Sequence, residues 1–275
     1  ISGFGQTGPY SQKPALDIVA QAISGMMSIN GELEGPPARL GISLGDLGAS
    51  VFAAIGILAA LEERHRSGLG QMLDLSMVDC QIALAEGPYM RYLTTKEIPQ
   101  RLGSRHPVFT PFQAFETKNG HIVVAIIGGT NDQWDLFCYA LDRLDLAEDE
   151  RFVDGWTRTV HHAILEPEIS AAMKKKTTEE WLEALSEFEI PCGPVNTIPQ
   201  AIEDPQVEAR QMLKEIPHKG LGKVTLVNSP IKLSRTPGEI RSAEPELGEH
   251  TDEVLQSFLG LTSSEIEELR NNGVL

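Results

Sequence analysis

Positive charge is scarce in this sequence, and its scarcity argues against one large class of function. The 275 residues include 23 Lys and Arg against 39 Asp and Glu, which gives a formal net charge of -16. A surface that binds nucleic acid needs clustered cations to neutralise phosphates. We therefore expect no nucleic-acid partner, and an anionic ligand must meet local cations or backbone amides.

Cysteine is scarce too. Cys80, Cys138 and Cys192 are widely separated and odd in number, which argues against a disulfide framework and is typical of a reducing compartment. We therefore expect a cytoplasmic protein. The pair His161 and His162 has no third metal ligand at helical spacing, so we expect no metal site.

Long apolar runs are missing as well. The richest segment, Val51 to Leu61, ends at Glu62 and Glu63, short of the roughly 18 apolar residues that a membrane helix needs. We therefore expect no membrane span. The chain starts at Ile1 without a basic segment or a signal-peptide pattern, so we expect it to begin inside a longer protein. Its length and its 41% hydrophobic content suit one large or two modest domains.

Apolar spacing predicts helices and one strand in the first part of the chain. Residues 17–29 and 47–64 have helical periodicity, and breakers at 31–37 separate them. Alternation over 71–77 predicts a strand, and a helix to about Tyr92 follows it. Residues 94–110 lack periodicity and carry several cations, a pattern typical of an ordered loop or an active-site lid.

A second set of elements begins near residue 111. Two short β-rich runs, 112–116 and 121–127, flank Lys118-Asn119-Gly120, which predicts a hairpin. Helices are predicted at 132–141 and at 179–188, the second with a capping box formed by Thr177 and Glu180. Further on, we expect a strand at 224–233 and helices at 252–259 and 263–271, with a second capping box at Thr262 and Glu265.

Several short motifs occur together in a fixed order. The N-terminal ones are Gly3-Phe4-Gly5-Gln6, Gly8-Pro9, Asp17-Ile18-Val19-Ala20-Gln21-Ala22, Gly35-Pro36-Pro37, Gly45-Asp46 and Gly68-Leu69-Gly70-Gln71. The later ones are Pro191-Cys192-Gly193-Pro194-Val195 and Leu247-Gly248-Glu249-His250-Thr251. In this combination the sequence resembles the CaiB/BaiF-type family III CoA-transferases, which include formyl-CoA transferase and carnitine CoA-transferase-like enzymes. The resemblance covers nearly the whole chain.

The resemblance implies a fold and an assembly. The fold class is α/β, with a large Rossmann-like α/β domain, a second, smaller α+β domain and an interlocked homodimer. Residues 1–110 would be the catalytic part of the large domain, 111–200 the small domain, and 201–275 a return to the large domain. Relatives have a longer N-terminal half, so on the order of a hundred residues would precede Ile1.

The resemblance makes Asp46 the catalytic carboxylate. It would attack an acyl-CoA thioester and then carry CoA as an aspartyl-CoA thioester, until a carboxylic-acid acceptor completes the exchange. Positioning and reduced solvation would supply most of the rate, and no metal or general base is required. Taken alone, an Asp at the start of a helix is more often a cap, and both interpretations stay open here.

The resemblance also implies residues that bind coenzyme A, which enters as the acyl-CoA substrate. They are Lys13, Pro14, Ala15, Leu16, Asp17 and Met77. Lys13 could pair with a CoA phosphate or simply be solvated. Without the resemblance, Asp17 would be interpreted as a helix cap and Met77 as a core residue at a strand end.

Two alternative functions stay open, and within the transferases the acceptor acid is also open. A related branch, the α-methylacyl-CoA racemases, carries a His-Asp pair where this chain has Leu16-Asp17, and Leu16 cannot accept a proton. A CoA-binding protein without turnover is the second alternative. The glycine run of the formyl-CoA:oxalate group is absent from 101–112, so oxalate is not the expected acceptor. Arg105 and His106 in that segment could meet an acceptor carboxylate, or be ordinary surface residues.

Overall fold

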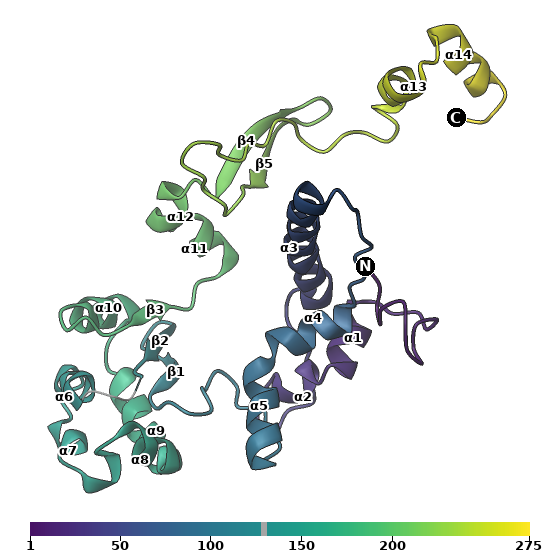
Figure 1. Ribbon diagram of the computed structural model, residues 1–275. Helices are drawn as coiled ribbons and strands as arrows, with labels where there is room; N and C mark the ends of the chain where they lie inside the picture. The colour runs from purple at the N-terminus through teal and green to yellow at the C-terminus, as the bar shows by residue number, and fades with distance from the viewer. Residues whose placement is uncertain (128–130) are drawn as a thin grey trace. The chain divides into compact units, whose positions relative to one another are not determined.

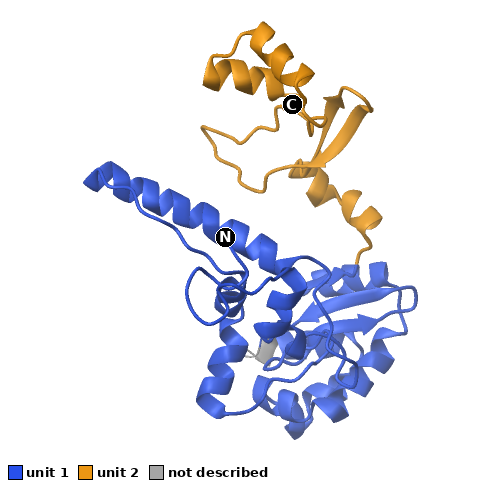
Figure 2. Ribbon diagram, turned by 90° about the vertical axis from the view of Figure 1, so that its right-hand side faces the viewer, with its two compact units in different colours: residues 1–195 blue, residues 196–275 orange. Residues whose placement is uncertain are grey.

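The computed structural model describes residues 1–127 and 131–275 and contains two compact units. Unit 1 is Ile1–Val195 and unit 2 is Asn196–Leu275 (Figure 2). Both units contain helices and antiparallel strands, which confirms the mixed α/β class. The division at residues 110 and 200, the Rossmann-like sheet and the interlocked homodimer stay predictions.

The first 95 residues form a group of helices (Figure 1). The single helix predicted over 17–29 is split, because Gly25 takes a positive φ of 78° and interrupts the α-helical backbone. The long helix predicted over 47–64 is confirmed and extends three residues further at each end. The helices are α1 (Asp17–Ile23), α2 (Met26–Ile29), α3 (Leu44–Ser67), α4 (Met77–Leu84) and α5 (Glu86–Thr95).

The strand predicted over 71–77 was wrong. Only Ser76 is paired, in an isolated parallel bridge to Ser2, and Met77 already begins α4. Alternation makes a strand only where a neighbour offers a row of donors and acceptors, and Ser2 is the one bridge partner of this segment among the described residues. Ser76 instead caps α4, since its Oγ accepts the N–H of Asp79 at 3.2 Å.

The hairpin predicted after residue 111 is confirmed and gains a third strand. β1 (Phe112–Glu116) pairs antiparallel with β2 (His121–Ala125), and β2 pairs antiparallel with β3 (Cys192–Pro194). Both predicted helices are confirmed within two residues at each end, and Thr177 with Glu180 forms the capping box. The other helices here are α6 (Asn131–Ala140), α7 (Leu144–Ala147), the 3-10 turn η1 (Glu150–Phe152), α8 (Gly155–Val160), α9 (His162–Met173) and α10 (Thr178–Ser186).

The main hydrophobic core of unit 1 lies between this sheet and these helices. Trp134, Phe137 and Trp181 are at most 1% exposed, and the indole N–H of Trp181 donates to the carbonyl of Met173 at 2.7 Å. Arg158 joins them, although no sequence pattern predicted its burial. Its guanidinium is buried and donates to two backbone carbonyls, those of Thr110 at 3.0 Å and Phe152 at 2.9 Å.

Unit 2 is built from helices and one hairpin. The strand predicted over 224–233 is confirmed only in its first residues, because β5 ends before Pro230, which cannot donate to a ladder. Its partner β4 was not predicted. The capping box of Thr262 and Glu265 is confirmed. The elements are α11 (Ile198–Ile202), α12 (Pro205–Ala209), β4 (Leu213–His218), β5 (Gly222–Val227), α13 (Thr251–Leu259) and α14 (Ser263–Asn271).

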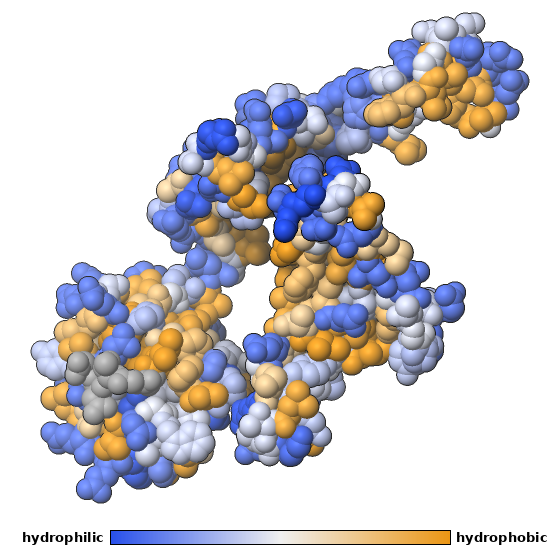
Figure 3. All heavy atoms as spheres, viewed as in Figure 1, coloured by the Kyte–Doolittle hydropathy of each residue, from blue (hydrophilic) through white to orange (hydrophobic). Residues whose placement is uncertain are grey.

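One apolar face of α3 is uncovered within unit 1. Leu47, Val51, Ile55 and Leu58 follow one another at helical spacing, and each is more than half exposed. Figure 3 shows apolar surface along this helix. By length and composition alone, α3 is the one helix of the described chain that could cross a membrane. A core helix of a soluble protein meets the same criterion, so this is weak support for a span.

Candidate active site

Asp46 lies in the first turn of α3, where a helix favours a negative charge. Its side chain is exposed and makes no hydrogen bond or ion pair with any residue of the described ranges. The N-cap position is Ser43. Asp46 therefore does not cap the helix, and its carboxylate oxygens face solvent without an internal partner.

Asp17 supports the residue next to it from the interior. Asp17 is 7% exposed, and its Oδ1 accepts the backbone N–H of Gly45 at 2.8 Å. Its Oδ2 accepts Nε2 of Gln21 at 2.8 Å, and a guanidinium nitrogen of Arg39 lies 3.7 Å from the same oxygen. The N-cap of α1 is Leu16. Asp17 thus links two helices and holds the start of α3, and does not cap its own helix.

Gln21 and Gln81 extend this polar network. Oε1 of Gln21 accepts the N–H of Leu40 at 2.9 Å, and its Nε2 also reaches the carbonyl of Ile42 at 3.3 Å. This fixes the chain just before α3. Ser24 Oγ donates to Oε1 of Gln81 at 3.2 Å, while Nε2 of Gln81 is buried without a partner among the described atoms. Neither glutamine was singled out from the sequence, although the i, i+4 spacing of Asp17 and Gln21 was a usable signal.

Gly45 is required by this packing. A Cβ at this position would lie 2.7 Å from Nε2 of Gln81 and 3.1 Å from Oδ1 of Asp17. No side chain fits without moving them. The glycine beside Asp46 in the sequence motif therefore has a physical reason, since it lets α1 and α4 approach the first turn of α3.

The segment predicted to bind CoA leads into α1. Lys13 is exposed, and its ammonium lies 3.6 Å from the ring centroid of Tyr10. Pro14 and Leu16 are exposed, and Leu16 is 75% accessible. Ala15 is partly buried and packs against the apolar cluster that contains Ala20 and Met77. The segment just before the buried Asp17 therefore exposes one cation, Lys13, and the apolar side chains of Pro14 and Leu16.

Met77 lies in a small apolar cluster below the start of α3. It is 8% exposed and packs with Ala20 of α1, Ala49 of α3, and Val78 and Cys80 of α4. Met77 is the first residue of α4, not the end of a strand. The structure thus brings Ala15, Asp17 and Met77 together around the base of α3, while Lys13, Pro14 and Leu16 lie on the exposed approach.

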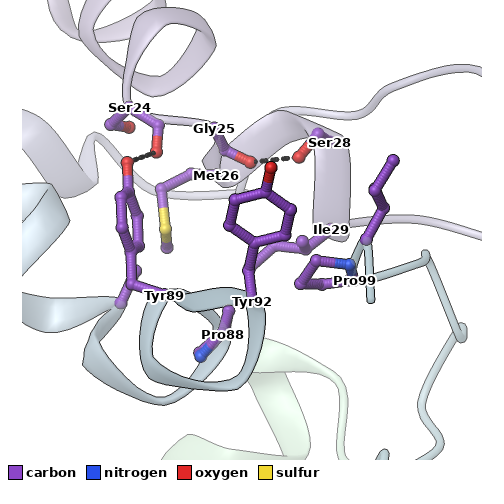
Figure 4. A pocket seen from close by; sticks show the side chains of 11 residues that line it. Ser24, Gly25, Met26, Ser28, Ile29, Pro88, Tyr89, Tyr92 and Pro99 are labelled. Carbon is purple, nitrogen blue, oxygen red and sulfur yellow. Dashed lines mark hydrogen bonds between the residues drawn. The ribbon is translucent and has the colours of Figure 1, made fainter. Parts of the chain in front are cut away.

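A small apolar cavity of about 170 Å³ lies where α1 and α2 meet α5 (Figure 4). Tyr89 lines it, and its hydroxyl donates to the carbonyl of Ser24 at 2.9 Å. Because Ser24 also contacts Gln81, this cavity adjoins the network behind Gly45. Across residues 1–127 and 131–275 we find no group of three or more His, Cys, Asp and Glu side chains that could hold a metal ion.

Known proteins resemble this chain over most of its length. The family model described as CoA-transferase family III matches residues 1–251. The succinate–glutarate CoA-transferase of Agrobacterium fabrum is 34% identical over 93% of this chain and 63% of its own length. The succinyl-CoA:glutarate CoA-transferase of Homo sapiens is 31% identical over 100% of this chain and 62% of its own length. The chain therefore spans less than two thirds of either relative.

Solved structures give the same picture. A CAIB/BAIF family protein from Brucella suis has a TM-score of 0.78 and 30% identity, covering 92% of this chain and 65% of that chain. Rv3272 from Mycobacterium tuberculosis has a TM-score of 0.77 and 26% identity, covering 91% of this chain and 64% of that chain. Both fold and sequence therefore agree on one family.

Proposed function

The chain belongs to CoA-transferase family III, and from that premise we propose that it carries the catalytic part of an acyl-CoA:carboxylate CoA-transferase that works through an aspartyl-CoA thioester on Asp46. One observation carries the proposal. The carboxylate of Asp46 is exposed in the first turn of α3 with no hydrogen bond to the described residues, while the backbone beside it is held by the buried Asp17. A nucleophile needs this combination of free lone pairs and a fixed position.

The proposed reaction has two symmetrical halves. An oxygen of Asp46 attacks the acyl carbon of the donor, the carbon–sulfur bond breaks, and a mixed anhydride and the CoA thiolate result. The thiolate then attacks the side-chain carbonyl of Asp46, so that the donor leaves as a free carboxylate and CoA stays as a thioester. An acceptor carboxylate reverses these steps, which yields a new acyl-CoA and restores Asp46. Atoms and charge balance without a metal, an oxidant or a general base.

The remaining predicted residues take supporting parts in this proposal. Lys13 offers an exposed cation for a phosphate of CoA, and Pro14 and Leu16 offer apolar surface for its pantetheine arm. Ala15 and Met77 shape the base of the site from the cluster beneath it. Because Asp17 is buried and accepts a hydrogen bond on each oxygen, we assign it to positioning Gly45, and its direct contact with CoA stays a prediction.

The names of the relatives favour dicarboxylic acids. The relatives are described as transferases between succinate, glutarate, mesaconate or citramalate and CoA. We therefore propose succinyl-CoA or a similar short dicarboxylic acyl-CoA as the donor and a short dicarboxylate as the acceptor. The racemase alternative has no support in the described site, because Leu16 stands exposed where a base would be needed.

We further propose that the whole protein is a homodimer in the cytoplasm. The exposed apolar face of α3, formed by Leu47, Val51, Ile55 and Leu58, supports the association of two subunits, since contiguous apolar surface is unfavourable in water. Cysteines that form no disulfide fit a reducing compartment. The relatives are about half as long again as this chain, so the activity, the assembly and any membrane contact belong to the full-length protein.

Mass spectrometry tests the proposal directly. The full-length protein is incubated with succinyl-CoA, and the peptide containing Asp46 is examined for a covalently bound CoA. We expect the CoA adduct on this peptide, and we expect Asp46→Ala to lose both the adduct and transfer to glutarate. A matched control is Asp79→Ala, because Asp79 is also an exposed carboxylate at the third position of a helix.

The control should keep the adduct and the transfer activity. An adduct that persists in Asp46→Ala would assign the nucleophile to another residue. Transfer without any adduct would mean direct transfer between substrates. Solvent deuterium that enters the α-carbon of a 2-methylacyl-CoA, without an acceptor acid, would instead support the racemase.

A further inference from the structure

A second, larger cavity in unit 1 has a different lining. It has a volume of about 620 Å³, within the range of small-molecule sites. It lies between α5 and the segment 96–108, the non-periodic segment that precedes β1. Its walls are largely apolar and include the exposed side chain of Trp156 from α8. The apolar residues that line it include Ile29, Pro88, Pro99, Leu102, Val108 and Trp156.

Two guanidinium groups line this apolar space. Arg91 forms an ion pair with Glu97 at 3.0 Å. Arg105 forms no ion pair or side-chain hydrogen bond with any residue in 1–127 or 131–275, and its Nε is buried without a partner. Burial and the nearby charge of Arg91 both lower the pKa of Arg105. One half-buried cation, whose Nε is fully buried, thus has no counter-charge among the described residues, a costly arrangement unless an anion binds there.

The neighbouring His106 adds a directed donor. Its Nδ1 accepts the backbone N–H groups of Val108 and Phe109, each at 3.1 Å, so the ring carries its proton on Nε2 when neutral. Burial lowers the pKa of His106, which favours that neutral form. Stacking on Phe109, with ring centroids 4.8 Å apart, fixes the ring. His106 lines the cavity, and its Nε2 makes no hydrogen bond with a residue of the described ranges, which leaves the Nε2–H free for an acceptor.

We propose that this cavity binds a short aliphatic carboxylic acid, with its carboxylate on Arg105 and His106 and its hydrocarbon part against the prolines, Leu102 and Trp156. The planar fork of a guanidinium matches the two oxygens of a carboxylate. A pyrophosphate would need several unpaired cations, and Arg91 is already paired with Glu97. That the acid is the CoA acceptor rests on the proposed function; that it binds here rests on the cavity.

Calorimetry with glutarate on the full-length protein tests the binding. We expect Arg105→Met to weaken glutarate at least tenfold and Arg105→Lys to weaken it less, because lysine keeps the charge but loses the fork. Lys96→Met is the matched control. It removes a cation from the same segment whose side chain is exposed and does not line the cavity, and it should leave glutarate affinity unchanged.

The same variants separate this inference from the proposed function. A parallel titration uses 3′,5′-ADP, the phosphate-bearing part of CoA, and should be unaffected by Arg105→Met. If 3′,5′-ADP loses affinity and glutarate does not, the cavity binds phosphate and the inference is overturned. Equal glutarate affinity and equal acceptor KM in Arg105→Met would also overturn it, even with transfer intact. If Asp46 carries no CoA adduct but glutarate binding still depends on Arg105, the inference stands and the proposed function fails.

We expect Arg105→Met to fold normally, so that a loss of glutarate affinity reports on binding. The substitution removes a charge that has no ion-pair partner among the described residues. The melting temperature of this variant should therefore equal or exceed that of the unchanged protein. A variant that melts lower would show that the guanidinium has a partner within the protein, which would overturn the argument for an anion.

Discussion

Adding a single methyl group at Gly45 tests whether the start of α3 is held as described. In Gly45→Ala, the new Cβ would lie 2.7 Å from Nε2 of Gln81 and 3.1 Å from Oδ1 of Asp17. Overpacking of this kind costs about 1–3 kcal/mol. The greater helix propensity of Ala offsets up to about 1 kcal/mol. If the N–H of Gly45 moves off the carboxylate of Asp17, a further loss of about 1.5–3 kcal/mol follows.

We therefore expect Gly45→Ala to lower the free energy of unfolding in chemical denaturation by about 1.5–5 kcal/mol if the hydrogen bond to Asp17 is lost, and by at most about 2 kcal/mol if it survives. Gly87→Ala is the matched control, because Gly87 is also in the first turn of a helix, but among the described residues beyond its chain neighbours and its own helix backbone no heavy atom lies within 4 Å of its added Cβ. It should leave stability unchanged or raise it. In the double variant Gly45→Ala with Gln81→Ala, the closest clash is gone, so the double loss should be smaller than the sum of the single losses.

The rate of CoA transfer should fall in the same variants that lose stability. The first turn of α3 carries Asp46, the proposed nucleophile, and a displaced nucleophile loses rate even when it is chemically intact. We expect kcat for CoA transfer to fall about 100-fold in Gly45→Ala, with partial recovery in the double variant. Stability and transfer that both match the Gly87→Ala control would refute the claim that Asp17 and Gln81 close around Gly45.

Three further outcomes are expected. Asp46→Ala should leave the melting temperature within about 1 °C of the unchanged protein, because its side chain makes no bond to lose among the described residues. Cys138 is fully buried and its pKa is raised to about 12, so a thiol reagent should label it only in denaturant; rapid labelling of the native protein would contradict this burial. Burial lowers the pKa of His162 below its ordinary value of 6.5, so the unfolded chain binds the proton more readily. Stability should therefore fall as the pH drops through 6.5, and His162→Gln should make that fall shallower in denaturation at pH 7.5 and 5.5.

Local patterns predicted most helices because their signals lie within a few residues. The capping boxes at Thr177 and Thr262 are complete within four positions, and both formed as predicted. The break at Gly25 was missed because glycine is tolerated inside a helical pattern, and only the backbone dihedral angle reveals the left-handed turn. The strand over 71–77 failed for the opposite reason, since alternation does not show whether a partner strand exists.

Long-range polar contacts were outside the reach of sequence patterns. Arg158 sits in a helix with ordinary spacing, and its burial depends on two carbonyls, one of them 48 residues away at Thr110. Gln81 contacts Ser24 across 57 residues. The resemblance pointed to Asp17 and Asp46 as separate site residues, whereas their connection through the backbone of Gly45 needed the structure.

Asp17 and Asp46 are carboxylates with contrasting environments, and the contrast fits the different roles that we propose for them. A carboxylate that accepts two hydrogen bonds is well placed to fix a backbone, but its lone pairs are engaged and it is screened from a substrate. Asp17 has this environment, with 7% exposure and both oxygens bonded. Asp46 is one residue beyond the amide that Asp17 holds, and its own oxygens stay outside the network. A buried neighbour therefore fixes the backbone beside Asp46, and the exposed carboxylate keeps the free lone pairs that the proposed attack on a thioester requires.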